Sequence, residues 1–430
     1  MRKDKNMKKL IWILLVIAFL FYPSFYPSAK NIAYSLHKYS KEEFTHLEES
    51  YDENGIKDGI VVGGNFQEEK EEEEERTQFI LIKYNKNGEK SWTYTYEEEV
   101  KTKMLDLDYT YNEEGQVDGY LLLAEKEDEE SKEVKTMFFK ISISGELLSE
   151  KETLFPKIKK ILPISTDGKV EGYIAITEPT EQGSFLIRYN LECDVLWSKL
   201  QDQELEDIVI LYQEEKPTAY MIMTKTESEK SILRTTMDGE TSTTIISGLQ
   251  NQDSSLMAVE NMLLVYGLTP DVKLEQEAYS YFLNKYDEEG NLIWESIGEI
   301  PINHERKINL FYRENQFFFC YQNQVDKSYE VITLDQEGLY EKKVKKIPNS
   351  YYEIHDFIVV DDVLYFVGKI HCFADDNCDY IENSLFLISD EDKVIELEKK
   401  ENTNIVLAFL ILIFALFLTI IFSKKKRKLK

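Results

Sequence analysis

The chain has 430 residues, 43% of them hydrophobic, so it can bury one large core or two modest ones, which excludes an intrinsically disordered polymer. It carries 51 Lys and Arg against 80 Asp and Glu, a formal net charge of -29. This charge repels polyanions and excludes a nucleic-acid binder that relies on neutralising phosphates. Composition therefore restricts the class of the protein without revealing its biochemical task.

Residues 1–30 have the layout of a secretory signal. Five basic residues within the first nine precede an apolar run at 10–22, and Ala29 offers a cleavage site. The run is short for a spanning helix, and Pro27 is unfavourable three positions before the cut. A cleaved signal peptide and a retained anchor both remain open.

A transmembrane helix is predicted at residues 403–423. Its core, from Ile405 to Phe422, contains no charged residue and would be about 27 Å long as a helix, close to the about 30 Å of a bilayer's hydrocarbon core. Residues 424–430 include six basic side chains, a cluster that the positive-inside bias keeps in the cytoplasm. We therefore expect membrane attachment through this helix and a basic cytoplasmic tail.

The middle of the chain, residues 31–402, is predicted to lie outside the cell membrane. Without the five basic residues and one acidic residue of the start, and without the six basic residues of the tail, 40 basic and 79 acidic residues remain. Both basic ends favour the cytoplasmic side, so the acidic middle is expected on the opposite side.

A repeat of about 50 residues fills this middle part. The clearest copies place a strand before an Asx-containing turn and a Trp, at residues 79–92, 185–197 and 282–294. Four worn copies keep the strand and turn at residues 139–145, 233–239, 331–338 and 386–391. The turn glycines are Gly88, Gly145, Gly239, Gly290 and Gly338, with Asp194 in the place of a further one.

Two more alternating or apolar stretches precede most copies, which gives about four strands per repeat. A single four-stranded sheet cannot cover both of its faces, so such units pack face to face around an axis. The sequence therefore predicts an all-β fold, a seven-bladed β-propeller of four-stranded antiparallel blades, with six or eight blades as the alternatives.

The residues Phe-Leu-Asn-Lys-Tyr-Asp-Glu-Glu-Gly-Asn-Leu-Ile-Trp at 282–294 resemble the repeat of bacterial secreted β-propeller proteins. Residues 83–92 and 188–197 match that repeat less fully. Similar blades occur in pyrroloquinoline-quinone dehydrogenases and outer-membrane assembly lipoproteins. The resemblance implies a fold and an exported location, but no activity or cofactor, because the family shares no chemistry.

The loops between the second and third strands should emerge on one face, and three of them are acidic. Together they form an acidic rim that includes Glu71, Glu72, Glu73, Glu74, Glu75, Asp375, Asp376 and Asp379. Such a rim could dock a cationic protein or peptide, or divalent ions, or it could simply be a set of solvated loops. The loops lack the Asp-x-Asp-x-Asp-Gly spacing of a calcium loop, so no specific metal site is predicted.

Cysteines offer one disulfide. Cys372 and Cys378 could close a small loop in an oxidising exported space, whereas a zinc site there would have His371 and no fourth ligand. Cys320 is expected to be a buried apolar thiol, and Cys193 to be free.

Catalytic motifs are not found. Neither Gly-x-Ser-x-Gly nor Gly-x-Gly-x-x-Gly occurs, and the adjacent His355 and Asp356 are expected to mark a strand end. Trp92, Trp197 and Trp294 recur at one blade position, which favours packing over ligand stacking. We predict no catalytic, cofactor-binding or metal-binding residue.

The predicted function is a membrane-anchored binding or scaffolding module of unknown specificity. The alternative is an exported enzyme, such as a glycan lyase or quinone dehydrogenase, with its site at the propeller channel. Carboxylates that converge with Arg and His at the channel mouth would favour the enzyme. An apolar or uniformly acidic mouth would favour binding.

Overall fold

The computed structural model describes residues 40–395 except 69–75, 87–89, 97–99, 113, 129–130, 156, 228, 250–253, 260, 271–278, 299–301, 303–307, 314, 348–351, 361–362, 371–381 and 389–393. The described part belongs to one compact unit, Lys38–Val394, apart from its last residue. The predicted signal, the transmembrane helix with Ile405 and Phe422, and the basic tail lie outside the described residues. In the part described, no helix is long and apolar enough to cross a membrane.

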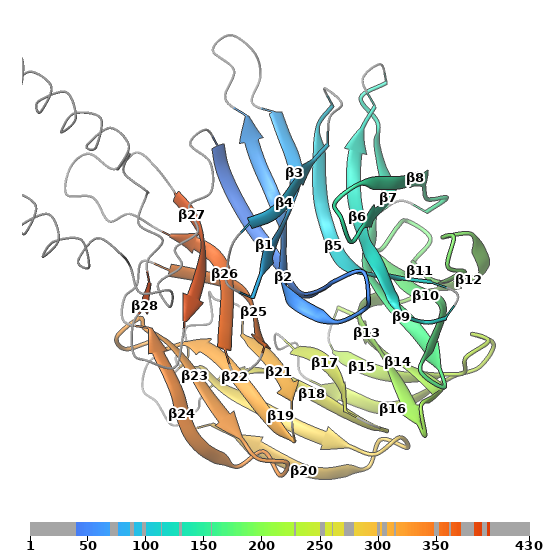
Figure 1. The fold of residues 1–430 in the computed structure, drawn as a ribbon. Coiled ribbons are helices and arrows are strands. Elements are labelled where there is room, and N and C mark those ends of the chain that lie inside the picture. The colour runs from blue at the N-terminus through green and yellow to red at the C-terminus, as the bar shows by residue number, and fades with distance from the viewer. Residues whose placement is uncertain are drawn as a thin grey trace, which may run out of the picture. The chain divides into compact units, whose positions relative to one another are not determined.

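The described strands form seven four-stranded antiparallel sheets, and in each sheet neighbouring strands are consecutive in the chain. We number the sheets 1 to 7 in chain order (Figure 1). Sheets 1 to 3 are β1 (Ser40–Tyr51), β2 (Lys57–Glu68), β3 (Arg76–Asn85) and β4 (Lys90–Thr95); β5 (Thr102–Tyr111), β6 (Val117–Glu127), β7 (Val134–Ser142) and β8 (Leu147–Glu152); β9 (Ile158–Thr166), β10 (Lys169–Thr177), β11 (Ser184–Tyr189) and β12 (Val195–Gln201).

The remaining sheets repeat the same up-and-down order. Sheets 4 to 7 are β13 (Glu204–Gln213), β14 (Lys216–Lys225), β15 (Lys230–Thr235) and β16 (Ser242–Leu249); β17 (Ser254–Val259), β18 (Met262–Pro270), β19 (Tyr279–Tyr286) and β20 (Leu292–Ile297); β21 (Asn309–Arg313), β22 (Gln316–Gln322), β23 (Tyr329–Leu334) and β24 (Tyr340–Ile347); β25 (Tyr352–Val360), β26 (Val363–Ile370), β27 (Glu382–Ile388) and β28 (Val394–Ile395).

The first strand of each sheet lies toward a common axis. First strands of neighbouring sheets contact each other, as β5 and β9 do, and β1 contacts β25 of the last sheet. In Figure 1, β16, β20 and β24 lie on the outside, while β13, β17 and β21 lie nearer the centre. The predicted all-β propeller of four-stranded antiparallel blades is therefore confirmed.

Burial follows from this arrangement. The second strands are covered on both faces by neighbouring sheets, and β6 and β14 each contain six consecutive buried residues. Such strands read as continuous apolar runs, which explains the runs recognised in the sequence. The outer strand β12 instead alternates between half-buried and exposed positions, because only one of its faces is covered.

The turns between third and fourth strands need a residue with positive φ. Gly145 (φ 87°), Gly239 (φ 73°) and Gly338 (φ 74°) supply it in sheets 2, 4 and 6. In sheet 3 the equivalent residue is Cys193, with φ 60°, because its N–H bonds to the Asn190 carbonyl as the N–H of Gly145 bonds to Ser142. The prediction that Asp194 replaces the glycine was wrong by one residue.

Candidate functional site

Seven polar residues occupy one equivalent position on the seven first strands. Each directly precedes a buried apolar residue of its strand, and in five sheets it directly follows a β-bulge opposite the second strand. We call this set the axial ring: His46, Asp106, Lys160, Asp207, Ser255, Asn309 and Asp356. The bulge offsets the strand locally, so a polar residue can sit between a buried residue two positions before it and another directly after it without displacing the core.

The three aspartates of the axial ring join neighbouring sheets. Asp207 accepts the N–H of Ile208 at 2.8 Å through Oδ1 and that of Leu256 in sheet 5 at 2.7 Å through Oδ2. Asp106 makes the same pair of contacts within sheet 2 and to Ile161 of sheet 3, at 3.0 and 3.1 Å. Hydrogen bonds to a carboxylate are stronger than neutral ones. We call the bond from an axial-ring aspartate to a backbone N–H of the neighbouring sheet an Asp latch.

The third Asp latch connects the two ends of the strand series. Asp356 of β25 accepts the N–H of Phe357 at 2.9 Å and the N–H of Leu47 in β1 at 3.2 Å. His355 and Asp356 were predicted to mark a strand end, and this was wrong: both lie inside β25, and Asp356 latches sheet 7 to sheet 1.

Two basic members of the axial ring face aspartates of the next sheet. Lys160 Nζ lies 2.6 Å from Asp207 Oδ1, and His46 Nε2 lies 3.7 Å from Asp106 Oδ1. The pair of Lys160 and Asp207 is half-buried. The lysine therefore holds the Asp207 side chain in place and also balances its negative charge. The histidine contact is longer and depends on the protonation of the ring.

Further acidic groups gather beside the axial ring in sheets 1 and 2. The Tyr109 hydroxyl lies 2.9 Å from Glu48 Oε2, and the Tyr109 N–H donates to Asp108 Oδ1 at 2.7 Å. Burial, with a smaller contribution from Asp106, raises the pKa of Asp108 to about 8. Burial and the nearby Asp108 also raise the pKa of Glu48 well above its usual range. The inner strands therefore hold more carboxyl groups than their bases neutralise.

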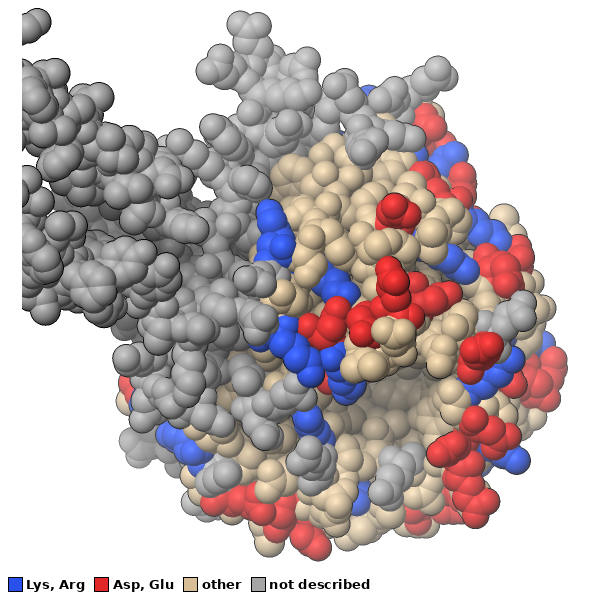
Figure 2. Space-filling view, in the orientation of Figure 1, with Lys and Arg blue, Asp and Glu red and all other residues tan. Residues whose placement is uncertain are grey.

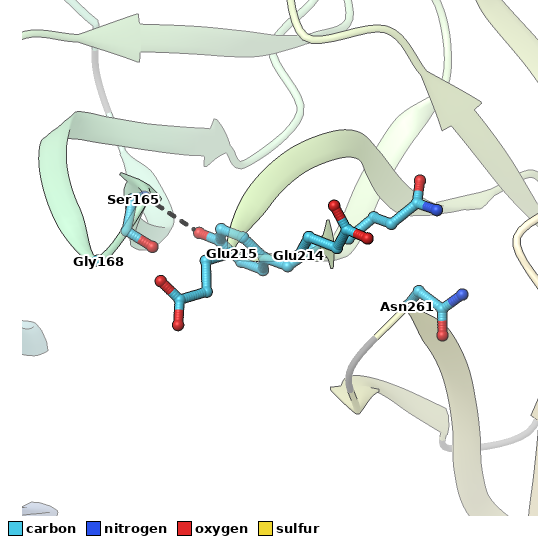
Figure 3. Close-up of a pocket in the computed structure, with 7 residues that line it drawn as sticks. Ser165, Gly168, Glu214, Glu215 and Asn261 are labelled. Carbon is cyan, nitrogen blue, oxygen red and sulfur yellow. Dashed lines mark hydrogen bonds between the residues drawn. The ribbon is translucent and has the colours of Figure 1, made fainter.

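A pocket of about 530 Å³ opens where the first and second strands of sheets 3, 4 and 5 are connected. It is lined by Ser165, Gly168, Tyr212, Gln213, Glu214, Glu215 and Asn261. Figure 3 shows Ser165 and Gly168 on one side, Asn261 on the other, and Glu214 and Glu215 between them. The Ser165 N–H donates to the Tyr212 hydroxyl at 3.2 Å, which fixes the aromatic ring in the wall.

The pocket is acidic and its central turn is strained. Its charged lining residues are Glu214 and Glu215, and both have positive φ, 49° and 62°, where a two-residue hairpin turn favours Asn and Gly. The neighbouring turn in sheet 3 uses Asp167 and Gly168 instead, and the Asp167 N–H bonds to the Glu215 carbonyl. Figure 2 shows a hollow framed by uncharged residues, with charged residues of both signs beside it.

The predicted acidic rim and the candidate disulfide fall on residues that the structure does not describe. Glu71 to Glu75, Asp375, Asp376 and Asp379, together with Cys372 and Cys378, all lie outside the described residues. Their loops do connect second to third strands, between β2 and β3 and between β26 and β27. Within the described ranges, no group of three His, Cys, Asp or Glu residues could hold a metal ion.

The other two cysteines are buried free thiols, which agrees with the predicted burial of Cys320 and the predicted free state of Cys193. Burial raises the pKa of Cys193 to about 11 and that of Cys320 further, so both thiols stay protonated and unreactive near neutral pH.

Sequence reasoning missed the axial ring and the pocket. The ring had a signal, a polar residue just before an apolar one in the first strand of each repeat, as in Asp106-Leu107 and Asp207-Ile208. These first strands were the weakest part of the repeat, so the position was not aligned. The pocket combines turns of three repeats and leaves no local motif.

No protein-family model matches the sequence, and no curated protein matches it. Among solved structures, the chain is similar to the β-propeller domain of the Trilobed protease from Pyrococcus furiosus, with 12% identity, a TM-score of 0.47, and coverage of 85% of this chain and 99% of that one. It is similar to the uncharacterized protein lmo1340 from Listeria monocytogenes EGD-e, with 13% identity, a TM-score of 0.48, and coverage of 78% and 92%.

The chain is also similar to an acylaminoacyl peptidase from Pyrococcus horikoshii, with 11% identity, a TM-score of 0.48, and coverage of 82% of this chain and 52% of that one. The chain thus spans about half the length of that peptidase. At such identities the likeness concerns the fold alone.

Proposed function

We propose that the chain is a membrane-anchored, extracytoplasmic β-propeller that binds a cationic protein or peptide at the pocket formed by Ser165, Tyr212, Glu214, Glu215 and Asn261. The observation that carries the proposal is the charge of the residues that line this pocket. Its charged lining residues are two exposed carboxylates, without Arg or His in the lining. A lining with two carboxylates and no base supports binding over an enzyme, whose site would need acids and bases to converge.

The pocket is suited to a Lys or Arg side chain. Its volume of about 530 Å³ exceeds that of one side chain and matches a short peptide segment. The Tyr212 ring offers an apolar or cation–π surface, and Glu214 and Glu215 offer opposite charge. The large negative charge of residues 10–423, with 79 acidic against 40 basic residues, would steer such a partner toward the surface.

Membrane anchorage and a ring of seven blades belong to the same proposal. Anchorage is supported by the uncharged run from Ile405 to Phe422 and the basic tail after it. Closure with seven blades is supported by the Leu47 to Asp356 bond, which repeats the Asp latch seen between sheets 2 and 3 and between sheets 4 and 5.

A binding titration with a turn-preserving variant tests the proposal. We would titrate the full-length protein in mild detergent with a fluorescent Lys-rich octapeptide, and with a Glu-rich octapeptide of the same length. The variant Glu214→Asn with Glu215→Gly removes both carboxylates and installs the residues that this turn prefers, so it should gain about 1 kcal/mol of stability. We expect the Lys-rich peptide to bind and the variant to lose about tenfold or more in affinity.

Glu181→Gln is the matched control, because Glu181 is an exposed carboxylate in the loop between β10 and β11. Its affinity for the peptide should equal that of the parent protein. Equal binding of both peptides, or an unchanged affinity in the double variant, would contradict the proposal.

A further inference from the structure

Another pocket, of about 230 Å³, lies between sheets 4 and 5, and it shares no residue with the pocket proposed for peptide binding. It is lined by Gly248, Leu249, Ser254, Val265, Thr269, Phe282, Asn284, Glu295 and Ile297. Gly248 and Leu249 belong to the outer strand β16 of sheet 4, and the other lining residues belong to sheet 5. We call this cavity the Asn284 pocket.

One wall of the Asn284 pocket is a face of sheet 5. Two rows of paired residues run across its strands β18, β19 and β20: Val265, Asn284 and Glu295 in one row, and Gly267, Phe282 and Ile297 in the next. The rows are two residues apart along each strand, so their side chains point to the same side of the sheet. Gly267 has no side chain, which leaves space beside Phe282.

Asn284 replaces an apolar residue of the repeat. It lies in the third strand of its sheet, three residues before Asp287, the first residue of the turn to the fourth strand. The corresponding residues of the other six sheets are all apolar: Ile82, Phe139, Ile187, Leu233, Ile332 and Phe386. A carboxamide in such a place loses contact with water, which is costly unless the group is hydrogen-bonded.

The Asn284 amide is only weakly bonded within the described part of the chain. Its Nδ2 lies 3.4 Å from the Tyr286 hydroxyl, which is a long hydrogen bond, and its buried Oδ1 has no partner. A buried acceptor without a donor costs free energy that a suitable donor would recover. One long bond does not fix the side chain, so the amide can turn toward a donor placed in the pocket.

The rest of the lining restricts the chemistry of a ligand. Leu249, Val265 and Phe282 give the pocket an apolar surface, and the exposed carboxylate of Glu295 is a further acceptor. The described lining residues include no Lys, Arg or His, so an anionic ligand would lack a counter-charge there. Such a lining suits an uncharged ligand with an apolar face and several donors.

A base close to the lining is already paired with an acid. Lys230 Nζ lies 3.4 Å from Ser254 Oγ, and it forms an ion pair with Glu206 at 2.5 Å. Lys230 therefore does not supply an unpaired positive charge to the Asn284 pocket.

We propose that the Asn284 pocket binds one uncharged sugar residue. A pyranose ring has apolar C–H faces and hydroxyl donors around its edge, which match the apolar wall, the Asn284 amide and the Glu295 carboxylate. The volume is below the about 300–1,000 Å³ of pockets for drug-sized ligands, so it accommodates a single ring. This activity goes beyond the proposed peptide binding and uses different strands and turns.

Saturation-transfer difference NMR on the full-length protein in a sugar-free detergent tests the proposal. The probes are the methyl glycosides of glucose, galactose, mannose and N-acetylglucosamine, with methyl glucuronide as the anionic probe. We expect at least one neutral glycoside to bind with a saturable signal. Methyl glucuronide should bind about tenfold more weakly than that glycoside, because the Glu295 carboxylate repels it.

The variant Asn284→Leu installs the residue that sheet 4 has at this position. It should weaken binding of the neutral glycoside about tenfold or more, because the amide is lost, while the melting temperature stays equal or rises. Glu295→Ala should weaken binding about fivefold through the loss of an exposed acceptor. Glu181→Ala, another exposed glutamate, is its matched control and should bind as the parent protein does.

The double variant Glu214→Asn with Glu215→Gly should also bind the glycoside as the parent protein does, which separates this pocket from the peptide site. Absence of binding by all four neutral glycosides would overturn the proposal. An unchanged affinity in Asn284→Leu together with a lower melting temperature would overturn it too, because the amide would then serve folding alone. If Asn284→Leu does not fold, equal affinities of Glu295→Ala and Glu181→Ala would decide against the site.

Discussion

Two kinds of contact hold neighbouring sheets of this propeller together, and they lie at opposite ends of the sheets. On the outer strands, Trp92, Trp197 and Trp294 of sheets 1, 3 and 5 pack on a turn glycine of the next sheet. A methyl group built on Gly145 would lie 2.7 Å from the Trp92 ring, and Gly239 and Gly338 are equally close to Trp197 and Trp294. Near the axis, the Asp latches of sheets 2, 4 and 7 reach the following sheet.

The two contacts alternate around the series from sheet 1 to sheet 5. We call the contact of such a Trp with the turn glycine of the next sheet a Trp clamp. Trp clamps join sheets 1 to 2 and 3 to 4, while Asp latches join sheets 2 to 3 and 4 to 5. Each Trp also meets the edge of an aromatic ring on the next sheet's second strand, as Trp92 meets Tyr120 at 5.9 Å. The Trp contacts thus serve the outer strands, and the Asp latches serve the first strands, which form the inner edges of their sheets.

The comparison teaches that worn and intact repeats have different jobs. The Trp residues of sheets 1, 3 and 5 supply a clamp, and the turn glycines of sheets 2, 4 and 6 receive it, whereas Gly290 of sheet 5 packs on Ile245. The sheets without this Trp, 2, 4 and 6, thus still take part in the clamped contacts through their turn glycines.

The largest expected effect comes from removing a clamp. Trp197→Ala should lower the free energy of unfolding by about 3 kcal/mol, because it leaves a void above Gly239 and beside Tyr220. Denaturant unfolding followed by far-ultraviolet circular dichroism measures it. Leu196 lies on the same strand and is 57% exposed, so Leu196→Ala is the matched control. A loss below about 1 kcal/mol for Trp197→Ala would contradict the clamp.

An intermediate effect is expected from removing a latch. Asp207→Ala should cost about 2 kcal/mol, because the Leu256 N–H and the Lys160 ammonium both lose their acceptor. Asp207→Asn keeps an acceptor and should cost less. The same unfolding assay applies, with the exposed Asp202→Ala as control; equal stability of Asp207→Ala and the parent protein would show that the latch contributes nothing.

The smallest effect is expected at an exposed ion pair between sheets 3 and 4, the two sheets that Trp197 joins. Lys199 of sheet 3 lies 2.6 Å from Glu240 of sheet 4, and Glu240 is exposed. Glu240→Gln should change the free energy of unfolding by less than about 0.5 kcal/mol, because water and salt screen the pair. A larger loss would mean that charge, and not Trp197, holds this contact.

Much of the fold could be predicted because each strand and turn of the repeat depends on residues that are close together in the sequence. The apolar second strands and the Tyr-to-Trp spacing of residues 282–294 place strands and turns correctly, since each depends on neighbours in sequence. The position of Cys193 in its turn was missed by one residue, because glycine and aspartate are more familiar turn residues than a buried thiol. Asp356 was read as part of a strand end, because a β-bulge leaves no signal in a single sequence.

The candidate site could be predicted only in kind. A binding face with acidic character was expected from the loops at residues 67–77 and 370–383, whereas the described acidic pocket is formed by Glu214 and Glu215 in a different set of turns. Two adjacent glutamates in a sequence with 80 acidic residues are not distinctive.

The amino-acid sequence by itself determined the strands and the turns, because those features follow from side-chain alternation and backbone freedom within a few residues. Tertiary structure alone decided which polar residues meet around the axis and which turns form the pocket. The partners there are separated by about 50 residues within the series, and by 309 residues between Leu47 and Asp356. Such contacts depend on how whole sheets pack, which no local pattern encodes.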